Sequence, residues 1–306
     1  MLNVTDFGAL PDAQIVNGSL LGTDNTLAIQ AAIDAASGDT VEFGKGSYRC
    51  GALNLTNRAP LKLQGAGPAY GGTTLMPTCD GGIFLNCAGT PAVKLSGLTI
   101  GDRYNPHIPA VAILHAPTSA VVGADFVHHE DVMVTGRYSK AALCVWGVGT
   151  SMAEKCAYWN FYEGEAFSGA FSFDNVFSLE SPFCVFAPGA AGCWTLLNCE
   201  FHDYQTAGPY QKVPLLLRGT FDTQFIGGVI SGSNRLIRCQ DPSGQNPPRR
   251  LVFMGVRFEN EGGTPQPANV LDLVSNLENT SFIRCMQGQS GSFAAGAGSL
   301  VGCEII

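Results

Sequence analysis

A short pattern recurs along most of the chain, and its spacing restricts the possible folds more than any other feature. Each copy has a Gly, Asn, Asp or Lys, then a small or apolar residue, then any residue, then usually an apolar one. Copies begin at residues 97, 131, 155, 175, 198, 228, 255, 279 and 302, so successive copies lie 20 to 34 residues apart. Alternation with a period of two indicates a short strand with one buried face. A strand repeated at this spacing, with no helix between copies, predicts the stacked coils of a solenoid.

The first fifty residues contain the one clear amphipathic helix pattern. In TDNTLAIQAAID (23–34) and the two alanines after it, apolar residues fall at 28, 29, 32, 33 and 36. Thr23 or Asp24 is placed to cap the start of this helix. The segments VTDFGA (4–9) and DTVEFGKGSY (39–48) flank it on either side.

These three segments together resemble the start of the pectate-lyase-like superfamily, which includes polygalacturonase-like enzymes and many phage tailspikes. Gly44 stands where that family commonly has Pro. The resemblance implies an all-β fold, a right-handed parallel β-helix, for which we expect about ten coils. We expect one domain over 1–306, with an N-terminal strand–helix–strand cap (1–50) and stacked coils (51–306). The helix would cover the N-terminal opening, because the end of a solenoid exposes unpaired strand edges.

Composition narrows the classes of partner. The net charge of −8 argues against nucleic acid, and no apolar run is long enough for membrane insertion. The first residues show no signal peptide, which favours synthesis in a host cytoplasm. Eleven cysteines form no C-x-x-C pair and no zinc-type cluster, so we expect mostly buried thiols and leave disulfides open. No cofactor and no metal are predicted.

A carboxylate pair is the first hypothesis for chemistry. Residues four after the second position of each repeat include Asn160, Glu180 and Asp203, on coils expected to be consecutive. If Glu180 and Asp203 lie about 5–6 Å apart, they could act as a catalytic pair with His202 beside them. The alternative is a column of polar turn residues, where Asn and Asp fit tight backbone conformations.

Two other stretches are candidates. Residues 125–131 hold His128 and His129 among acids, which suits proton transfer or a metal but lacks a clear third ligand group, and a solvated turn explains it equally. The aromatic stretch 158–165 predicts glycan stacking by Tyr158, Trp159 and Tyr162, with packing against a loop or a second subunit as the alternative.

Several expectations about assembly follow. Apolar residues expected on the outside (Met133, Phe177 and Ile230) could meet a neighbouring chain in a homotrimer. Cys156 and Cys199 are expected two coils apart, at about 9.6 Å, and therefore not bonded to each other.

Three classes of function are compatible with these features of the sequence. None of the polygalacturonase motifs Asn-Thr-Asp, Asp-Asp, Gly-His-Gly and Arg-Ile-Lys occurs. The resemblance therefore favours a virion structural or receptor-binding protein (tailspike, fibre or surface decoration) that joins other virion proteins and contacts a cell-surface polysaccharide. A polysaccharide lyase or glycoside hydrolase acting on a bacterial surface polysaccharide is the alternative, and a non-catalytic glycan-binding module is the third.

Overall fold

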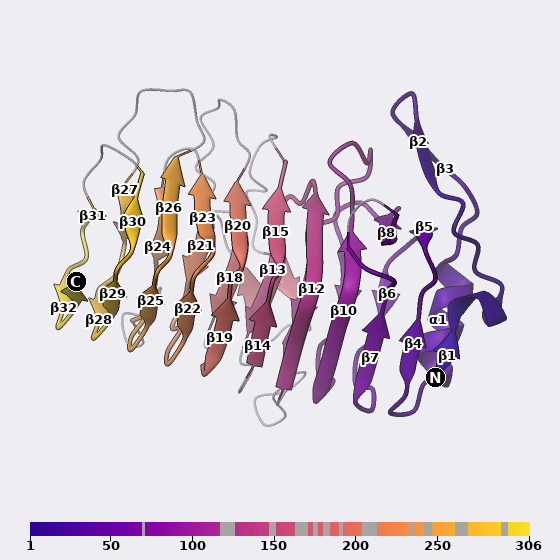
Figure 1. The fold of residues 1–306 in the computed structure, drawn as a ribbon, viewed down its shortest axis with the longest axis horizontal. Coiled ribbons are helices and arrows are strands. Elements are labelled where there is room, and N and C mark those ends of the chain that lie inside the picture. Colours follow the sequence, from indigo (N-terminus) through magenta and orange to yellow (C-terminus); the bar gives the residue numbers. More distant parts are fainter. Residues whose placement is uncertain are drawn as a thin grey trace.

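Parallel strands stack from one end of the molecule to the other, in chain order (Figure 1). The computed structural model describes residues 1–68, 71–116, 126–146, 151–162, 171–173, 177–179, 184–189, 192–203, 213–232, 235–241, 247–260, 269–288 and 293–306. All pairings within the two large sheets are parallel, as a β-helix requires. In these described ranges, no helix is both long and apolar enough to cross a membrane.

The larger sheet has 18 strands. They are β1 (Leu2–Asn3), β4 (Thr40–Glu42), β5 (Gly46–Cys50), β7 (Leu61–Gln64), β8 (Thr73–Pro77), β10 (Ala92–Ile100), β12 (Phe126–Gly136), β14 (Ser151–Glu154), β15 (Ala157–Asn160), β19 (Trp194–Leu197), β20 (Glu200–Asp203), β22 (Gln224–Ile226), β23 (Val229–Gly232), β25 (Val252–Met254), β26 (Arg257–Asn260), β29 (Ser281–Ile283), β30 (Met286–Gln287) and β33 (Glu304–Ile305).

The second sheet has nine strands. They are β6 (Leu53–Asn54), β9 (Ile83–Asn86), β11 (Val111–His115), β13 (Ala141–Trp146), β18 (Cys184–Gly189), β21 (Val213–Leu217), β24 (Arg235–Cys239), β27 (Asn269–Leu273) and β31 (Ala294–Gly296). The remaining elements are the 3₁₀ helix η1 (Val4–Phe7), the helix α1 (Thr26–Ala35), and three strand pairs: β2 (Gln14–Val16) with β3 (Ser19–Leu21), β16 (Phe171–Phe173) with β17 (Phe177–Leu179), and β28 (Leu277–Glu278) with β32 (Leu300–Val301).

The larger sheet consists of two ladders of strands, a first through β14 and β19 and a second through β15 and β20. Copies of the recurring pattern that begin at 97, 131, 155, 198, 228 and 255 mark the bend between them. Strands β10 and β12 run through both ladders, whereas later coils divide into pairs such as β14 with β15 and β19 with β20. Each bend contains at least one residue with a positive φ: Gly97, Asp131, Lys155, Asn198, Gly227 with Gly228, Gly255 and Arg284. Gly, Asn and Asp adopt this conformation most readily, which explains their frequency at the first position of the pattern.

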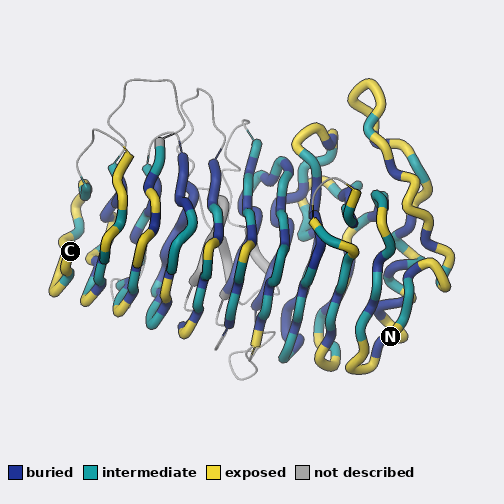
Figure 2. The backbone as a smooth tube through the Cα atoms, in the orientation of Figure 1, coloured by how far each residue is buried: buried dark blue, intermediate teal, exposed yellow. Residues whose placement is uncertain are grey.

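The core is a continuous column of apolar side chains inside the coils. Buried residues are dark blue on the backbone tube of Figure 2 and recur along the stack. In-register stacking places like rings on like rings. Phe225, Phe253 and Phe282 stack nearly parallel, with centroids 4.5 and 4.9 Å apart. Tyr158 stacks on Phe201 in the same way, at 5.5 Å.

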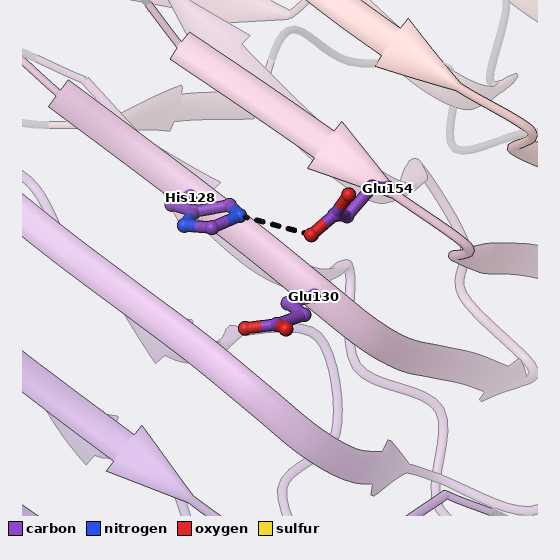
Figure 3. Close-up of side chains that lie close together, drawn as sticks. All are labelled: His128, Glu130 and Glu154. Atoms are coloured by element: carbon purple, nitrogen blue, oxygen red, sulfur yellow. Dashed lines mark ion pairs between the residues drawn. The ribbon is translucent and has the colours of Figure 1, made fainter.

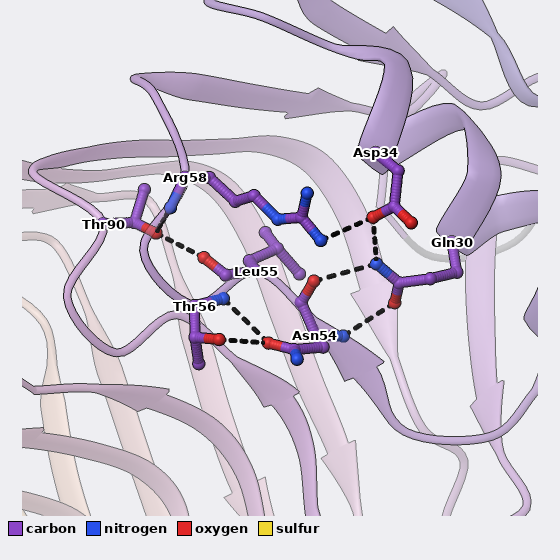
Figure 4. Close-up of polar contacts among 7 residues, drawn as sticks. All are labelled: Gln30, Asp34, Asn54, Leu55, Thr56, Arg58 and Thr90. Atoms are coloured by element: carbon purple, nitrogen blue, oxygen red, sulfur yellow. Dashed lines mark hydrogen bonds and ion pairs between the residues drawn. The ribbon is translucent and has the colours of Figure 1, made fainter. Parts of the chain in front are cut away.

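Helix α1 lies beside the N-terminal strands and is joined to the edge of the nine-stranded sheet (Figures 1 and 4). Ile29, Ala32 and Ile33 are fully buried in the main core. The side-chain amide of Gln30 donates to the backbone oxygen of Asn54 at 2.9 Å and accepts from its N–H at 2.8 Å. Because β6 ends the sheet, this amide occupies the place of a missing neighbouring strand.

Three features of the predicted register are wrong. The strand β17, which contains the end of the copy that begins at residue 175, adds no coil to the larger sheet, because it pairs antiparallel with β16 while β15 pairs directly with β20. Val229 pairs with Glu200, one residue away from the predicted alignment, because two positive-φ glycines (227 and 228) precede β23. The last two copies of the pattern belong to the ladder of β25, through β29 and β33.

These shifts change the placement of particular residues. Ile230 is 1% exposed and lies in the core, so it does not face outward. Cys156 and Cys199 lie on adjacent coils, not two coils apart, since Ala157 pairs with Glu200. Both are free thiols, as expected, but the distance argument behind that expectation is wrong.

Candidate functional site

A groove of about 580 Å³ crosses the outer surface of several coils and is the main candidate for ligand binding. Its floor is a row of in-register side chains: Ser47 pairs with Thr74, Thr74 with Thr99, and Thr99 with Met133. Side chains in register on one face of a parallel sheet repeat at the strand spacing of about 4.8 Å. The floor therefore offers a line of hydroxyl groups that runs along the stack.

Aromatic side chains line the groove. Trp159 on β15 is in register with Thr135 on β12, and both contribute to the lining together with Phe161. Tyr104 is 63% exposed, and the guanidinium carbon of Arg103 lies 4.5 Å from its ring centroid. Aromatic rings with polar neighbours are the surface on which sugar rings stack, so the groove suits an extended glycan.

The three predicted glycan-contacting residues lie in different environments. Strand alternation points Tyr158 and Trp159 to opposite faces. Tyr158 is fully buried, with its hydroxyl 2.7 Å from His129 Nδ1, so its predicted glycan contact is wrong. Tyr162 is half-buried, its N–H donates to Asn160 Oδ1, and it does not line the groove. Residues 163–165 of this stretch lie outside the described residues.

Of the two predicted catalytic carboxylates, the structure describes the position of Asp203 alone. Glu180 lies outside the described residues. Asp203, at the end of β20, is 1% exposed and pairs with Asn160. The Asn160 side chain accepts from the Tyr138 N–H at 3.0 Å and donates to the Tyr138 oxygen at 2.9 Å. Asp203 thus holds the same position in the next coil, which matches the alternative of a polar turn column.

His202 lies between the interior and the groove. It is 7% exposed, and its ring is edge-on to Trp159 with centroids 5.6 Å apart. Its Nε2 is 3.6 Å from Glu200 Oε2. His202 can therefore orient Trp159, whereas its own access to a ligand is small.

A second cluster lies on strands β12 and β14, and it includes part of the stretch 125–131 for which the sequence suggested histidine–acid chemistry. His128 and Glu130 project from β12, and Glu154 projects from β14 (Figure 3). His128 Nε2 is 3.8 Å from Glu154 Oε1, and Lys94 Nζ is 2.6 Å from Glu130 Oε2. Burial and the charge of Lys94 lower the pKa of His128, while the Lys94 contact lowers the pKa of Glu130.

The other histidine of this stretch faces the interior. His129 Nε2 is 3.0 Å from His115 Nε2, and both rings are fully buried. Burial lowers the pKa of His115 to about 3 and holds that of His129 well below its usual range. Both are therefore neutral core residues at neutral pH, and alternation along β12 separates them from the outward His128.

Sequence reasoning missed Glu154 as a member of the outer cluster. The signal was present, because Glu130 and Glu154 each directly precede the first residue of a repeat copy. Equivalent positions in adjacent coils are neighbours in space, and the structure pairs these two residues.

Comparisons with known proteins identify the fold. No protein-family model and no curated protein matches the chain. Among solved structures, ORF18 of Geobacillus virus E2 is similar, with a TM-score of 0.57 and 14% identity over 100% of this chain and 61% of that one. The enzymatically active domain of tailspike protein 2 from bacteriophage CBA120 gives 0.60 and 13% identity, over 99% of this chain and 46% of that one.

An alginate lyase from a Paenibacillus species is also similar, with a TM-score of 0.50 and 13% identity over 89% of this chain and 96% of the lyase. The chain thus spans about three fifths of the viral ORF18 protein and under half of the tailspike domain. At these identities the likeness shows the fold alone. The chain has the parallel β-helix fold that a phage tailspike domain and an alginate lyase share.

Proposed function

We propose that this protein is a virion surface protein of tailspike type that binds a host cell-surface polysaccharide in the groove described above. The observation that carries the proposal is the groove itself, in which Trp159 and Tyr104 flank a row of hydroxyl side chains over several coils. A polymer of repeating sugars suits a surface of repeating coils. Phage origin of two of the similar structures supports the virion location.

Binding without cleavage is favoured by the charges in the groove. Among the described residues that line the groove, Asp102 is the one carboxylate, and its Oδ1 accepts a 2.7 Å hydrogen bond from the Tyr104 N–H. Glycoside hydrolysis normally takes two carboxylates, about 5–5.5 Å apart in retaining enzymes and about 6.5–9.5 Å apart in inverting ones. A polysaccharide lyase or glycoside hydrolase is the second candidate, supported by the fold shared with an alginate lyase.

The test is a screen of purified bacterial surface polysaccharides with the wild-type protein. Binding is measured by calorimetry, and cleavage by new reducing ends and by the ultraviolet absorbance of unsaturated products. Saturable binding with intact polymer supports the proposal. Product formation would instead support the enzyme, and absence of binding to every polysaccharide in the screen would contradict both.

A homotrimer is the assembly we propose, joined to other virion proteins. The resemblance of the first fifty residues to a family that includes tailspikes favours it, and closed cyclic symmetry is the usual arrangement of homo-oligomers. The chain mass is 32.2 kDa, so light scattering behind a sizing column should give three times this value. A monomer at every concentration tested would contradict assembly in solution.

A further inference from the structure

We propose that His128, Glu130 and Glu154 form a binding site for a divalent first-row transition metal, with Zn²⁺ as the best-fitting ion. The site is separate from the groove and does not depend on the proposed function. It revises the expectation of no metal, which rested on the missing third ligand in the sequence.

The coil stack assembles the three ligands. His128 and Glu130 are two residues apart on β12 and share its outward face. Glu154 is the register partner of Glu130 on the next strand, β14. The site would therefore link two adjacent coils, and each ligand is held by a paired strand, not by a loop.

The spacing of the ligand atoms suits one ion. One nitrogen and two carboxylate oxygens lie within 4.8 Å of one another. Tetrahedral zinc with bonds of about 2.0–2.2 Å holds its ligand atoms roughly 3.4 Å apart. The difference can be closed by rotation of the two glutamate side chains, which are 35% (Glu130) and 24% (Glu154) exposed.

The donor set selects the kind of metal. An imidazole nitrogen with two carboxylates favours Zn²⁺ and similar ions over Ca²⁺ and Mg²⁺, which prefer oxygen ligands alone. His128 Nε2 is shielded from solvent and accepts no hydrogen bond from any part of the chain that the structure describes. This nitrogen lies 3.8 Å from Glu154 Oε1, so the two ligand atoms face the same space.

Lys94 competes with the metal. Its ammonium group contacts Glu130 Oε2 at 2.6 Å and provides the positive charge next to the carboxylates in the metal-free protein. Metal binding must displace it or use the other oxygen of Glu130. The effect of removing Lys94 on Zn²⁺ affinity therefore distinguishes a metal site from a purely structural ion-pair network.

The experiment is calorimetric titration of the purified wild-type protein with Zn²⁺, with Ca²⁺ as the comparison ion. We expect one Zn²⁺ per chain, and a loss of affinity of at least about tenfold in both His128→Ala and Glu154→Gln. The control His107→Ala removes another histidine beside an acid, Asp80, and should leave Zn²⁺ affinity unchanged. Lys94→Gln should bind Zn²⁺ several times more tightly.

Co²⁺ provides a second readout, because cysteine ligation produces thiolate charge-transfer absorption that a nitrogen–oxygen site lacks. The nearly isosteric Glu154→Gln keeps the test valid if His128→Ala folds poorly. Equal Zn²⁺ affinity in wild type and Glu154→Gln, weaker binding in Lys94→Gln, or a thiolate spectrum would each overturn the proposal.

Discussion

Two buried histidines should make the free energy of unfolding of this protein depend on pH. His115 and His129 face each other through their Nε2 atoms at 3.0 Å, so one nitrogen donates and the other accepts. Protonating both rings would place two donors against each other in the core. The pKa of His115 is lowered to about 3 and that of His129 lies well below its usual range, both through burial.

The unfolded chain therefore binds more protons than the folded protein below about pH 6.5. Since stability rises with pH wherever the unfolded state binds more protons, the unfolding free energy should fall as pH falls from about 6.5 toward 3. Each histidine contributes about 1.4 kcal/mol per pH unit in this window. Urea unfolding between pH 7.5 and 4.5 measures the slope.

Substitutions of histidines separate their contribution to the pH dependence of stability from the contribution of the carboxylates. The double change of His115 and His129 to Gln should flatten the slope between pH 6 and 4.5, whereas His107→Gln at a more exposed site should not. An unchanged slope in the double variant would contradict the assignment of neutral core histidines.

The positive-φ residues at the bends lead to a second prediction for single residues. Gly255 has φ +65°, and an added Cβ would meet no atom within 4 Å, so Gly255→Ala tests backbone conformation alone. Gly82 is equally open but lacks the positive φ. We expect Gly255→Ala to be less stable than Gly82→Ala by about 1–2 kcal/mol in urea unfolding, because alanine disfavours the left-handed region. Equal stabilities would show that the bend tolerates side chains freely.

At the scale of elements, α1 matters chiefly as a partner for the first strands. The Gln30 amide satisfies both the N–H and the oxygen of Asn54 on the edge strand β6 (Figure 4). Asp34 accepts from both Gln30 and Arg58, which fixes the position of the amide. We therefore expect α1 to act as the N-terminal cap of the coil stack.

Gln30→Ala tests this cap. It removes two hydrogen bonds to the sheet edge and should lower the unfolding free energy by about 1–3 kcal/mol. Hydrogen exchange at the Asn54 amide should accelerate in the same variant. Gln14→Ala, at an exposed position of the β2–β3 hairpin, should change stability by less than about 0.5 kcal/mol. Equal effects of the two substitutions would argue against the cap.

At the scale of the whole molecule, the coil architecture was predictable because the bends impose a sequence requirement. Gly97, Asp131 and Asn198 are positive-φ residues, and that conformation restricts side-chain choice once per coil. The pattern failed at the copy that includes Phe177 and Ser178, because a local match cannot distinguish a coil strand from one strand of an antiparallel pair.

The candidate site was harder to predict than the fold. Trp159 was selected for its residue type, but Tyr158 beside it is interior, and only the register shows which of the two faces out. Ser47, Thr74 and Thr99 of the floor come from three successive coils, 27 and 25 residues apart in the sequence, so no local motif marks them. Their grouping depends on which residues stack across coils.

The central claim is that the groove around Trp159 binds polysaccharide, and a calorimetric comparison of two variants tests it most directly. Phe126 is a matched control, since it is 43% exposed on β12 but does not line this groove. With a polysaccharide that the wild type binds, Trp159→Ala should weaken binding by about 1–3 kcal/mol, roughly 5- to 150-fold, whereas Phe126→Ala should leave it unchanged. Equal affinity in wild type and Trp159→Ala, with the fold intact by circular dichroism, would contradict the assignment of this groove.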